Sequence, residues 1–219
     1  MAQSESQSQI GGANSDYPVQ FSVDYQESSN RLSVLVRIIL AIPIFVVGAF
    51  IGGYIDTGSP ELNQDLAPLY AGGFLFIAPL LMIVFRKKYP KWWFDWNLEL
   101  SRFTARVEAY VLLLRDEYPS TDEEQSVHLQ IEYPNAETDL NRILPIFKWL
   151  LAIPHYIVLA VLGVLAVVAT ILAWLIILLT GRYPRGMFDF VVGVLRWGTR
   201  VGAYAFLLVT DRYPPFSLE

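Results

Sequence analysis

The sequence contains no cysteine, and charged residues occupy only 17% of its 219 positions. Ordinary soluble domains carry roughly 25% charged residues, so this chain has too few polar side chains to cover a globule of its length. The lack of cysteine excludes a disulfide framework and a cysteine-ligated metal site. A formal net charge of −5 argues against a basic nucleic-acid binder, and 54% hydrophobic residues argue against a disordered chain.

Basic residues are also missing from two long stretches. All 16 Lys and Arg lie outside residues 38–85 and 149–181. Both stretches are long enough for membrane-spanning helices, which need about 20 apolar residues each. The sequence therefore predicts an all-α integral membrane protein.

Two parts of the sequence match each other. Eight residues of 88–119 recur in 182–214 at a constant offset of 94, and one extra residue then brings Tyr118-Pro119 onto Tyr213-Pro214. The eight are Tyr89, Pro90, Phe94, Asp95, Arg102, Arg106, Ala109 and Tyr110, matching Tyr183, Pro184, Phe188, Asp189, Arg196, Arg200, Ala203 and Tyr204. Upstream, Asn30-Arg31 and Ala41-Ile42-Pro43 match Asn141-Arg142 and Ala152-Ile153-Pro154 at an offset of 111. The pattern predicts a tandem duplication, with repeat one at 17–124 and repeat two at 125–219.

Each repeat is expected to contain a helical hairpin in the membrane. Repeat one has apolar runs at 32–53 and 66–85, and the first would form a helix of about 33 Å, enough to cross a core of about 30 Å. The single run of repeat two, 143–180, would be about 57 Å long as one helix. We therefore expect two spans there, 143–162 and 163–180, joined by a turn near Leu162-Gly163.

The positions of the basic residues favour these four spans. With two hairpins, the basic clusters that flank the apolar runs fall on one side of the membrane, which the positive-inside rule makes cytoplasmic. The alternative is an interfacial helix up to Pro154 followed by one span from Tyr156 to Thr180, which would export the arginines that follow. We expect a multi-pass protein of the cytoplasmic (inner) membrane with both termini in the cytoplasm.

An amphipathic segment follows each hairpin, at 92–115 and 187–209, and is expected to form an interfacial helix. Each carries an Asp and two Arg at spacings of seven and four, which places all three on one side of a helix. These residues are Asp95, Arg102, Arg106, Asp189, Arg196 and Arg200. They suit ion pairs that link the repeats, or contacts to anionic lipid headgroups or a partner's acidic patch, because guanidinium groups bind phosphate in bidentate fashion.

Other residues mark the ends and interruptions of the expected spans. Pro43 and Pro154 would kink their helices, and His155 would be the polar group exposed at such a break, although packing is the simpler interpretation. Trp92, Trp93, Trp96 and Trp197 are typical of interfacial aromatics.

The remaining segments are short. Residues 19–25 and 127–133 alternate apolar and polar side chains, which predicts two short β-strands on the cytoplasmic face. Residues 1–16 are rich in Ser and Gln and are expected to form a disordered lead-in. They lack the features of a signal peptide, so the first span would direct targeting.

Five motifs in repeat two form a distinctive set. They are Ala-Ile-Pro-His at 152–155, Gly-Arg-Tyr-Pro at 181–184, Phe-Asp-Phe at 188–190, Val-Leu-Arg-Trp at 194–197 and Asp-Arg-Tyr-Pro-Pro-Phe-Ser-Leu at 211–218. The set resembles an uncharacterised family of small prokaryotic membrane proteins, known only as a domain of unknown function. Repeat one carries it in weaker form, with Ile44 in place of the His. The resemblance implies a membrane fold and brings no reaction, cofactor or catalytic residue.

The sequence offers surfaces for interaction rather than a set of catalytic residues. It contains no H-E-x-x-H, G-x-S-x-G or P-loop motif, and we expect no enzyme activity, cofactor, metal or nucleic-acid partner. We expect a scaffold or accessory subunit of a larger membrane complex, whose partners are membrane lipids and either other membrane subunits or itself. The alternative is a small transporter or channel that acts as an oligomer, because a duplicated hairpin pair is compatible with one.

Overall fold

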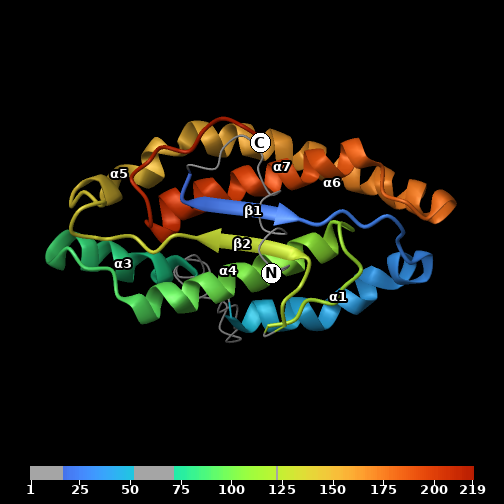
Figure 1. Cartoon of the computed structure of the whole chain (residues 1–219), viewed down its shortest axis with the longest axis horizontal. Coiled ribbons are helices and arrows are strands. Elements are labelled where there is room, and N and C mark those ends of the chain that lie inside the picture. Colours follow the sequence, from blue (N-terminus) through green and yellow to red (C-terminus); the bar gives the residue numbers. More distant parts are fainter. Residues whose placement is uncertain (1–16, 52–71, 122) are drawn as a thin grey trace, which may run out of the picture.

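The computed structural model describes residues 17–51, 72–121 and 123–219 (Figure 1). In chain order the elements are β1 (Val19–Val23), α1 (Arg31–Ile51), α3 (Gly72–Arg86), α4 (Lys91–Val111), β2 (Val127–Ile131), α5 (Leu144–Leu151), α6 (Ile153–Thr180), α7 (Arg185–Gly202) and the π-helical turn η2 (Ala203–Leu207). The expected lead-in at 1–16 and parts of the first two expected spans, 52–53 and 66–71, lie outside the described residues.

Two strands form a ribbon at the centre of the fold. β1 and β2 pair antiparallel, with Phe21 opposite Leu129, and both lie within the segments expected to be strands. Alternate side chains such as Val19 and Ile131 are buried, whereas Gln20 and Gln130 on the other face are exposed. The alternation in the sequence is therefore that of a ribbon with one apolar face.

Two helices carry the ribbon, and each comes from the opposite half of the chain. We call residues 17–124 the first half and 125–219 the second half. α7 of the second half packs against β1 of the first, and α4 of the first half packs against β2 of the second. Figure 1 shows the ribbon in front of α4 and α7, with α6 running lengthwise beside α7.

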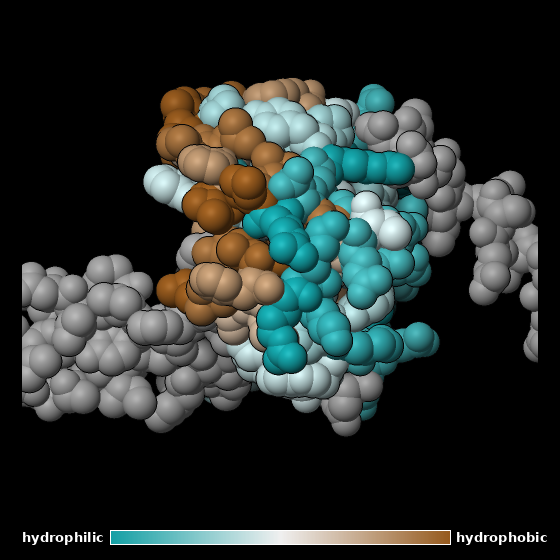
Figure 2. All heavy atoms as spheres, turned by 90° about the vertical axis from the view of Figure 1, so that its left-hand side faces the viewer, coloured by the Kyte–Doolittle hydropathy of each residue, from teal (hydrophilic) through white to brown (hydrophobic). Residues whose placement is uncertain are grey.

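The molecule has an apolar side and a polar side. Large apolar side chains are exposed along α1, α5 and α6, among them Leu35, Ile39, Phe147, Val161 and Leu172. Figure 2 shows apolar residues gathered on one side of the molecule and hydrophilic residues on the opposite side. The ribbon lies on the polar side, as the two views together show.

The turn expected near Leu162-Gly163 is not present, because α6 continues without a break from Ile153 to Thr180. An isolated glycine costs a helix only about 1 kcal/mol, and the flanking residues are apolar helix formers. The helix is interrupted earlier, at Ala152, which separates α5 from α6. Among the described residues, the stretch Leu144–Thr180 is the one long and apolar enough to cross a membrane.

The extra residue of the second half coincides with the π-helical turn. The offset between the halves is 94 at Tyr110 and Tyr204. Immediately after η2, Leu208 has the same left-handed backbone as Leu113, 95 positions earlier, with φ values of 58° and 64°. The π-helical turn therefore lies where the sequence offset between the halves changes from 94 to 95.

Candidate functional site

Two arginines hold the ribbon from its two edges. Arg102 of α4 donates from Nε to the carbonyl of Leu129 (3.1 Å), and Arg196 of α7 donates from Nε to the carbonyl of Phe21 (2.8 Å). A two-stranded ribbon leaves carbonyls unpaired along both edges, and the arginines satisfy one on each. We call these two arginines and two carbonyls the arginine clasp; it joins each helix to the strand of the other half.

Tyrosines connect the same parts of the chain. The hydroxyl of Tyr25 donates to the carbonyl of Tyr183 (2.6 Å), and the hydroxyl of Tyr133 donates to the carbonyl of Tyr89 (2.5 Å). Each bond starts just after a strand and ends just before the helix that supports that strand. The clasp is thus extended at the N-terminal ends of α4 and α7.

The second arginine of each expected stripe also binds main chain. Arg106 donates to the carbonyl of Ser120 (2.7 Å), and Arg200, only 4% exposed, donates to the carbonyl of Glu219. Arg196 makes a further bond to the carbonyl of Leu218 (2.9 Å). Burial lowers the pKa of Arg196 and Arg200, yet arginine stays charged at neutral pH. The four arginines are therefore engaged inside the fold.

The two aspartates of the stripes lie at the surface. Asp95 pairs with the exposed Lys91 of the preceding turn (2.7 Å), and Asp189 is exposed on α7. The structure thus divides each expected stripe: its arginines bind main chain and its aspartate faces outward.

Two ion pairs that the sequence analysis did not identify are more buried than the stripes. Lys148 is fully buried with Nζ 2.7 Å from Asp211, and the nearly buried Arg37 pairs with Asp116. Each cation also lies over a tyrosine ring, Arg37 over Tyr110 at 4.7 Å and Lys148 over Tyr204 at 5.3 Å from the ring centre. The cations are 111 positions apart and the aspartates 95, the offsets at which the two halves of the sequence match, so the sequence pattern could have identified both pairs.

The second oxygen of each aspartate holds the start of a helix. Asp116 accepts from the main-chain N–H of Asn30 (2.7 Å), and Asp211 accepts from that of Asn141 (2.6 Å). Each asparagine in turn accepts main-chain bonds at the beginning of the following helical segment, as an N-cap does. The ion pairs therefore join the first helix of each half to the segment that follows α4 or η2.

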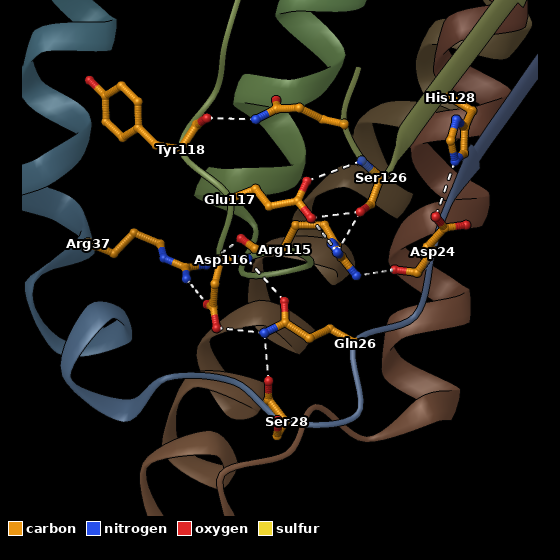
Figure 3. A network of polar contacts seen from close by, with 11 residues as sticks. Asp24, Gln26, Ser28, Arg37, Arg115, Asp116, Glu117, Tyr118, Ser126 and His128 are labelled. Carbon is orange, nitrogen blue, oxygen red and sulfur yellow. Dashed lines mark hydrogen bonds and ion pairs between the residues drawn. The ribbon is translucent and has the colours of Figure 1, made fainter. Parts of the chain in front are cut away.

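Figure 3 shows the polar network around the first of these pairs. Gln26 donates to Asp116 (2.8 Å), and Arg115 donates to Glu117 and to Ser126 (2.5 Å each). Burial alone would raise the pKa of Glu117, but the hydrogen bonds from Arg115 and Ser126 lower it to about 2. Glu117 is therefore ionised at neutral pH. It links Arg115, which follows α4, to Ser126, which precedes β2.

His155 is itself buried and lies in a cluster of aromatic rings. Its Nδ1 accepts a bond from Nε1 of Trp197 (3.1 Å), and its ring stacks on Phe216 with centroids 4.0 Å apart. Trp197 is only 4% exposed, so its expected place among the interfacial aromatics is wrong. The matching positions of the first half, Ile44 and Phe103, pack in one apolar cluster, which supports a packing role for His155.

The other residues singled out in the sequence have simpler surroundings. Pro43 lies within α1. Pro154 is in the first turn of α6, where a missing N–H is tolerated, and so marks the joint with α5 rather than a kink inside a span. Trp92 and Trp96 are exposed, as interfacial aromatics would be, and Trp93 is partly buried.

The arrangement fixes main chain to main chain through charged and aromatic side chains. Within the described ranges, no three His, Cys, Asp or Glu side chains are grouped to hold a metal ion. The site is therefore best described as a junction between the two halves.

Comparison with known proteins bears on the second half. No curated protein and no solved structure matches the chain. Residues 145–217, one third of the chain, match the family described as Domain of unknown function (DUF4389), which confirms for this segment the expected likeness to an uncharacterised family.

Proposed function

We propose that this protein is a membrane-seated scaffold or accessory subunit without enzyme activity, which places its apolar side in the bilayer and presents the ribbon side to the cytoplasm. The observation that carries the proposal is the two-sided construction of the fold. Exposed apolar residues follow α1, α5 and α6, whereas the exposed ribbon residues are polar, such as Gln20 and His128. A contiguous exposed apolar face of this extent indicates contact with lipid or protein.

We also infer that the two halves are repeats of one unit. The arginine–carbonyl bonds, the tyrosine bonds, the buried ion pairs and the asparagine caps each occur twice. Apart from the partners on or just after the strands, which lie 108 positions apart, their residues repeat at the offsets of 94, 95 and 111 found in the sequence. Each half contributes one strand to the ribbon and one helix to the strand of the other. The fold is then a pair of units that exchange strands within one chain.

The connections of α6 favour seating in the plane of the membrane. Its 28 residues make a helix of about 42 Å, longer than the hydrocarbon core of about 30 Å. The chain enters this region from β2 and leaves it into α7, and both belong to the layer around the ribbon. A helix whose two ends return to one layer, and whose long side exposes apolar residues, suits an in-plane position. This arrangement keeps both termini on the cytoplasmic side, as the four-span topology does.

Contacts to anionic headgroups are best assigned to basic residues outside the clasp. Arg31, Arg86, Arg142 and Arg182 are exposed next to the ends of the apolar helices. Long basic side chains at such ends reach the headgroup region while their stems stay in apolar surroundings. The arginines of the clasp, by contrast, stabilise the fold.

Single cysteines provide a direct test of the seating, because the chain has none of its own. We expect Ser22→Cys, on the outer face of the ribbon, to react with a membrane-impermeant maleimide only from the cytoplasmic side. Gly163→Cys, in the middle of α6, should be protected from both sides. Labelling of Gly163→Cys from outside would support the four-span topology, and labelling of Ser22→Cys from outside would contradict the orientation.

Site-specific crosslinking tests the scaffold role in the native cell. A photoreactive residue at Gln130, on the ribbon face, should give one discrete protein adduct, whereas the same residue at Leu165, on the apolar side of α6, should crosslink to lipid. A wet path through a purified oligomer, shown by ion flux in vesicles, would favour the transporter alternative.

A further inference from the structure

A cleft opens between α4 and α7, beside the inner face of the ribbon. Its volume is about 600 Å³, within the range of about 300–1,000 Å³ that is usual for small-molecule sites. Leu129 and Ile131 of the ribbon bound it on one side, and Pro79 of α3 and Leu159 of α6 lie at other edges. Most of the lining is apolar, so the cleft resembles the interior of a site for an apolar chain rather than a water-filled groove.

Most of the polar groups of the cleft lie on the α4 wall, and Thr199 adds a hydroxyl on α7. Asn97, Ser101, Thr104 and Glu108 follow one another at spacings of four, three and four, which places them on one face of the helix. The side chains of Asn97, Ser101 and Thr104 donate to helix carbonyls of the preceding turn (2.7, 2.7 and 2.9 Å). Their donors are therefore already engaged within α4.

Glu108 differs from its neighbours on this wall. Its carboxylate makes no hydrogen bond or ion pair with any residue that the structure describes, and it is the one charged side chain among the described lining residues. The side chain is exposed to the cleft while protein surrounds the cleft itself, and the resulting desolvation raises the pKa of the carboxyl. An acceptor of this kind is complementary to a donor or a cation.

The α7 wall provides the room. Gly198 and Gly202 occupy the positions that match Thr104 and Glu108 at the offset of 94. A Cβ built on either glycine meets no atom within 4 Å. The π-helical turn η2 continues this wall with Ala203, Phe206 and Leu207. The two glycines and the inserted residue, all features that the first half lacks, thus converge on one cavity.

We propose that this cleft binds an amphiphile with one apolar chain and an ammonium head, the chain lying along Gly198 and Gly202 and the head pairing with Glu108. The apolar lining suits a hydrocarbon chain, and the unpaired carboxylate selects a cationic head by charge. Thr104, Glu108 and Phe206 are the most exposed lining residues and mark the mouth of the cleft. This site goes beyond the scaffold role, since a subunit could be seated in the membrane without it.

The test uses the full-length protein in phosphatidylcholine nanodiscs and a photoactivatable dodecylamine as probe. We expect saturable labelling that maps to residues 97–108 and 195–207. Gly198→Leu should fill the cleft and reduce labelling more than tenfold, whereas Gly186→Leu, on the same helix and also unobstructed but outside the lining, should change it less than twofold. Leucine is a better helix former than glycine, so both variants should stay folded. Gly202→Ala is a second variant that adds a smaller group to the same wall of the cleft.

Competition identifies the head. Unlabelled dodecylamine should displace the probe at least tenfold better than dodecanol or dodecanoate, and Glu108→Gln should abolish that preference while Glu124→Gln, exposed on a loop, preserves it. Adding phosphatidylethanolamine tests the source of the ammonium group. Displacement of the probe would indicate an aminophospholipid, and no displacement would indicate a single-chain amine. Equal labelling of the Gly198→Leu and Gly186→Leu variants, or equal competition by dodecanoate, would overturn the proposal. Neither result would change the outcome of the maleimide labelling of Ser22→Cys and Gly163→Cys, which tests how the protein is seated in the membrane.

Discussion

Arg102 and Arg196 bind the two carbonyls that point outward from a single residue pair of the ribbon. The bonds from Asp24 N–H to the Ser126 carbonyl and from Glu132 N–H to the Pro18 carbonyl set the register (3.0 and 2.9 Å). In that register Phe21 and Leu129 form a pair whose own carbonyls face away from the partner strand. Each arginine therefore takes the position that a third strand would occupy.

Loss of a clasp arginine should lower the stability of the fold. Arg196→Ala leaves two partly buried carbonyls without these donors, and the loss of a buried partner costs about 1–3 kcal/mol. For a chain of this size we expect the melting temperature to fall by roughly 2–12 °C, measured by circular dichroism in mild detergent. Lys91→Ala, which breaks an exposed pair, is the control and should change it little.

The headgroup assignment predicts a different pattern of effects on membrane binding. Replacing Arg31, Arg86, Arg142 and Arg182 together by Gln should weaken sedimentation with anionic liposomes at low salt, because each exposed basic residue near the surface contributes about 1 kcal/mol. Arg102→Ala with Arg196→Ala should lower the melting temperature and leave the binding of the folded fraction unchanged. The reverse pattern would assign the headgroup contacts to the clasp.

The buried ion pair of the second half should be sensitive to the loss of one partner. Asp211→Ala leaves the fully buried Lys148 without its counter-charge and should cost about 3–5 kcal/mol in urea unfolding. Combining it with Lys148→Met should recover part of this loss, since no buried charge remains. A double variant less stable than Asp211→Ala would contradict this account.

Glu117 should make stability depend on acidic pH. Its folded pKa is lowered to about 2, below the value of about 4.3 expected in the unfolded chain. Its contribution is therefore fully present above about pH 4.5 and is lost as the pH falls toward 2. Glu117→Gln should flatten the melting temperature over this window relative to the unaltered protein, with Glu124→Gln as an exposed control. Parallel profiles for all three would disprove the role of Glu117.

The two halves offer a natural control for His155. His155→Ile alone leaves the indole N–H of Trp197 buried without an acceptor, at a cost of about 1–3 kcal/mol. Adding Trp197→Phe reproduces the Ile44 and Phe103 pair of the first half, and removing both polar partners should restore much of the stability. If the double variant were no better than the single one, His155 would have a role other than packing.

The sequence predicted what local patterns determine. Period-two alternation located the strands, and the amphipathic pattern located α4 and the α7–η2 segment. The uncharged runs showed where apolar surface would be exposed. The offset of 94 also identified Arg102 and Arg196 as a matched pair before their contacts were known.

The wrong or missing predictions concern features that do not follow from local sequence patterns. Excess length over one crossing predicted a turn near Gly163, but no polar or proline residue breaks the helix there, and α6 continues. Trp197 was expected at the membrane interface, yet the folded chain buries it against His155. Periodicity also does not say that a helix supports the strand of the other half, so the clasp and the residues around Glu108 became visible only in three dimensions.

The packing of β1 against α7, near the other end of the sequence, has a consequence for synthesis on the ribosome. The Arg196 bond to Phe21 joins residues 175 positions apart, so β1 emerges long before α7 exists. At about 5–20 residues per second, the strand waits roughly 9–35 s for its supporting helix. During that interval the apolar face of β1 and the edge that Arg196 later binds stay open to other chains. The first strand is therefore the segment that most needs protection, for example by a chaperone, during synthesis.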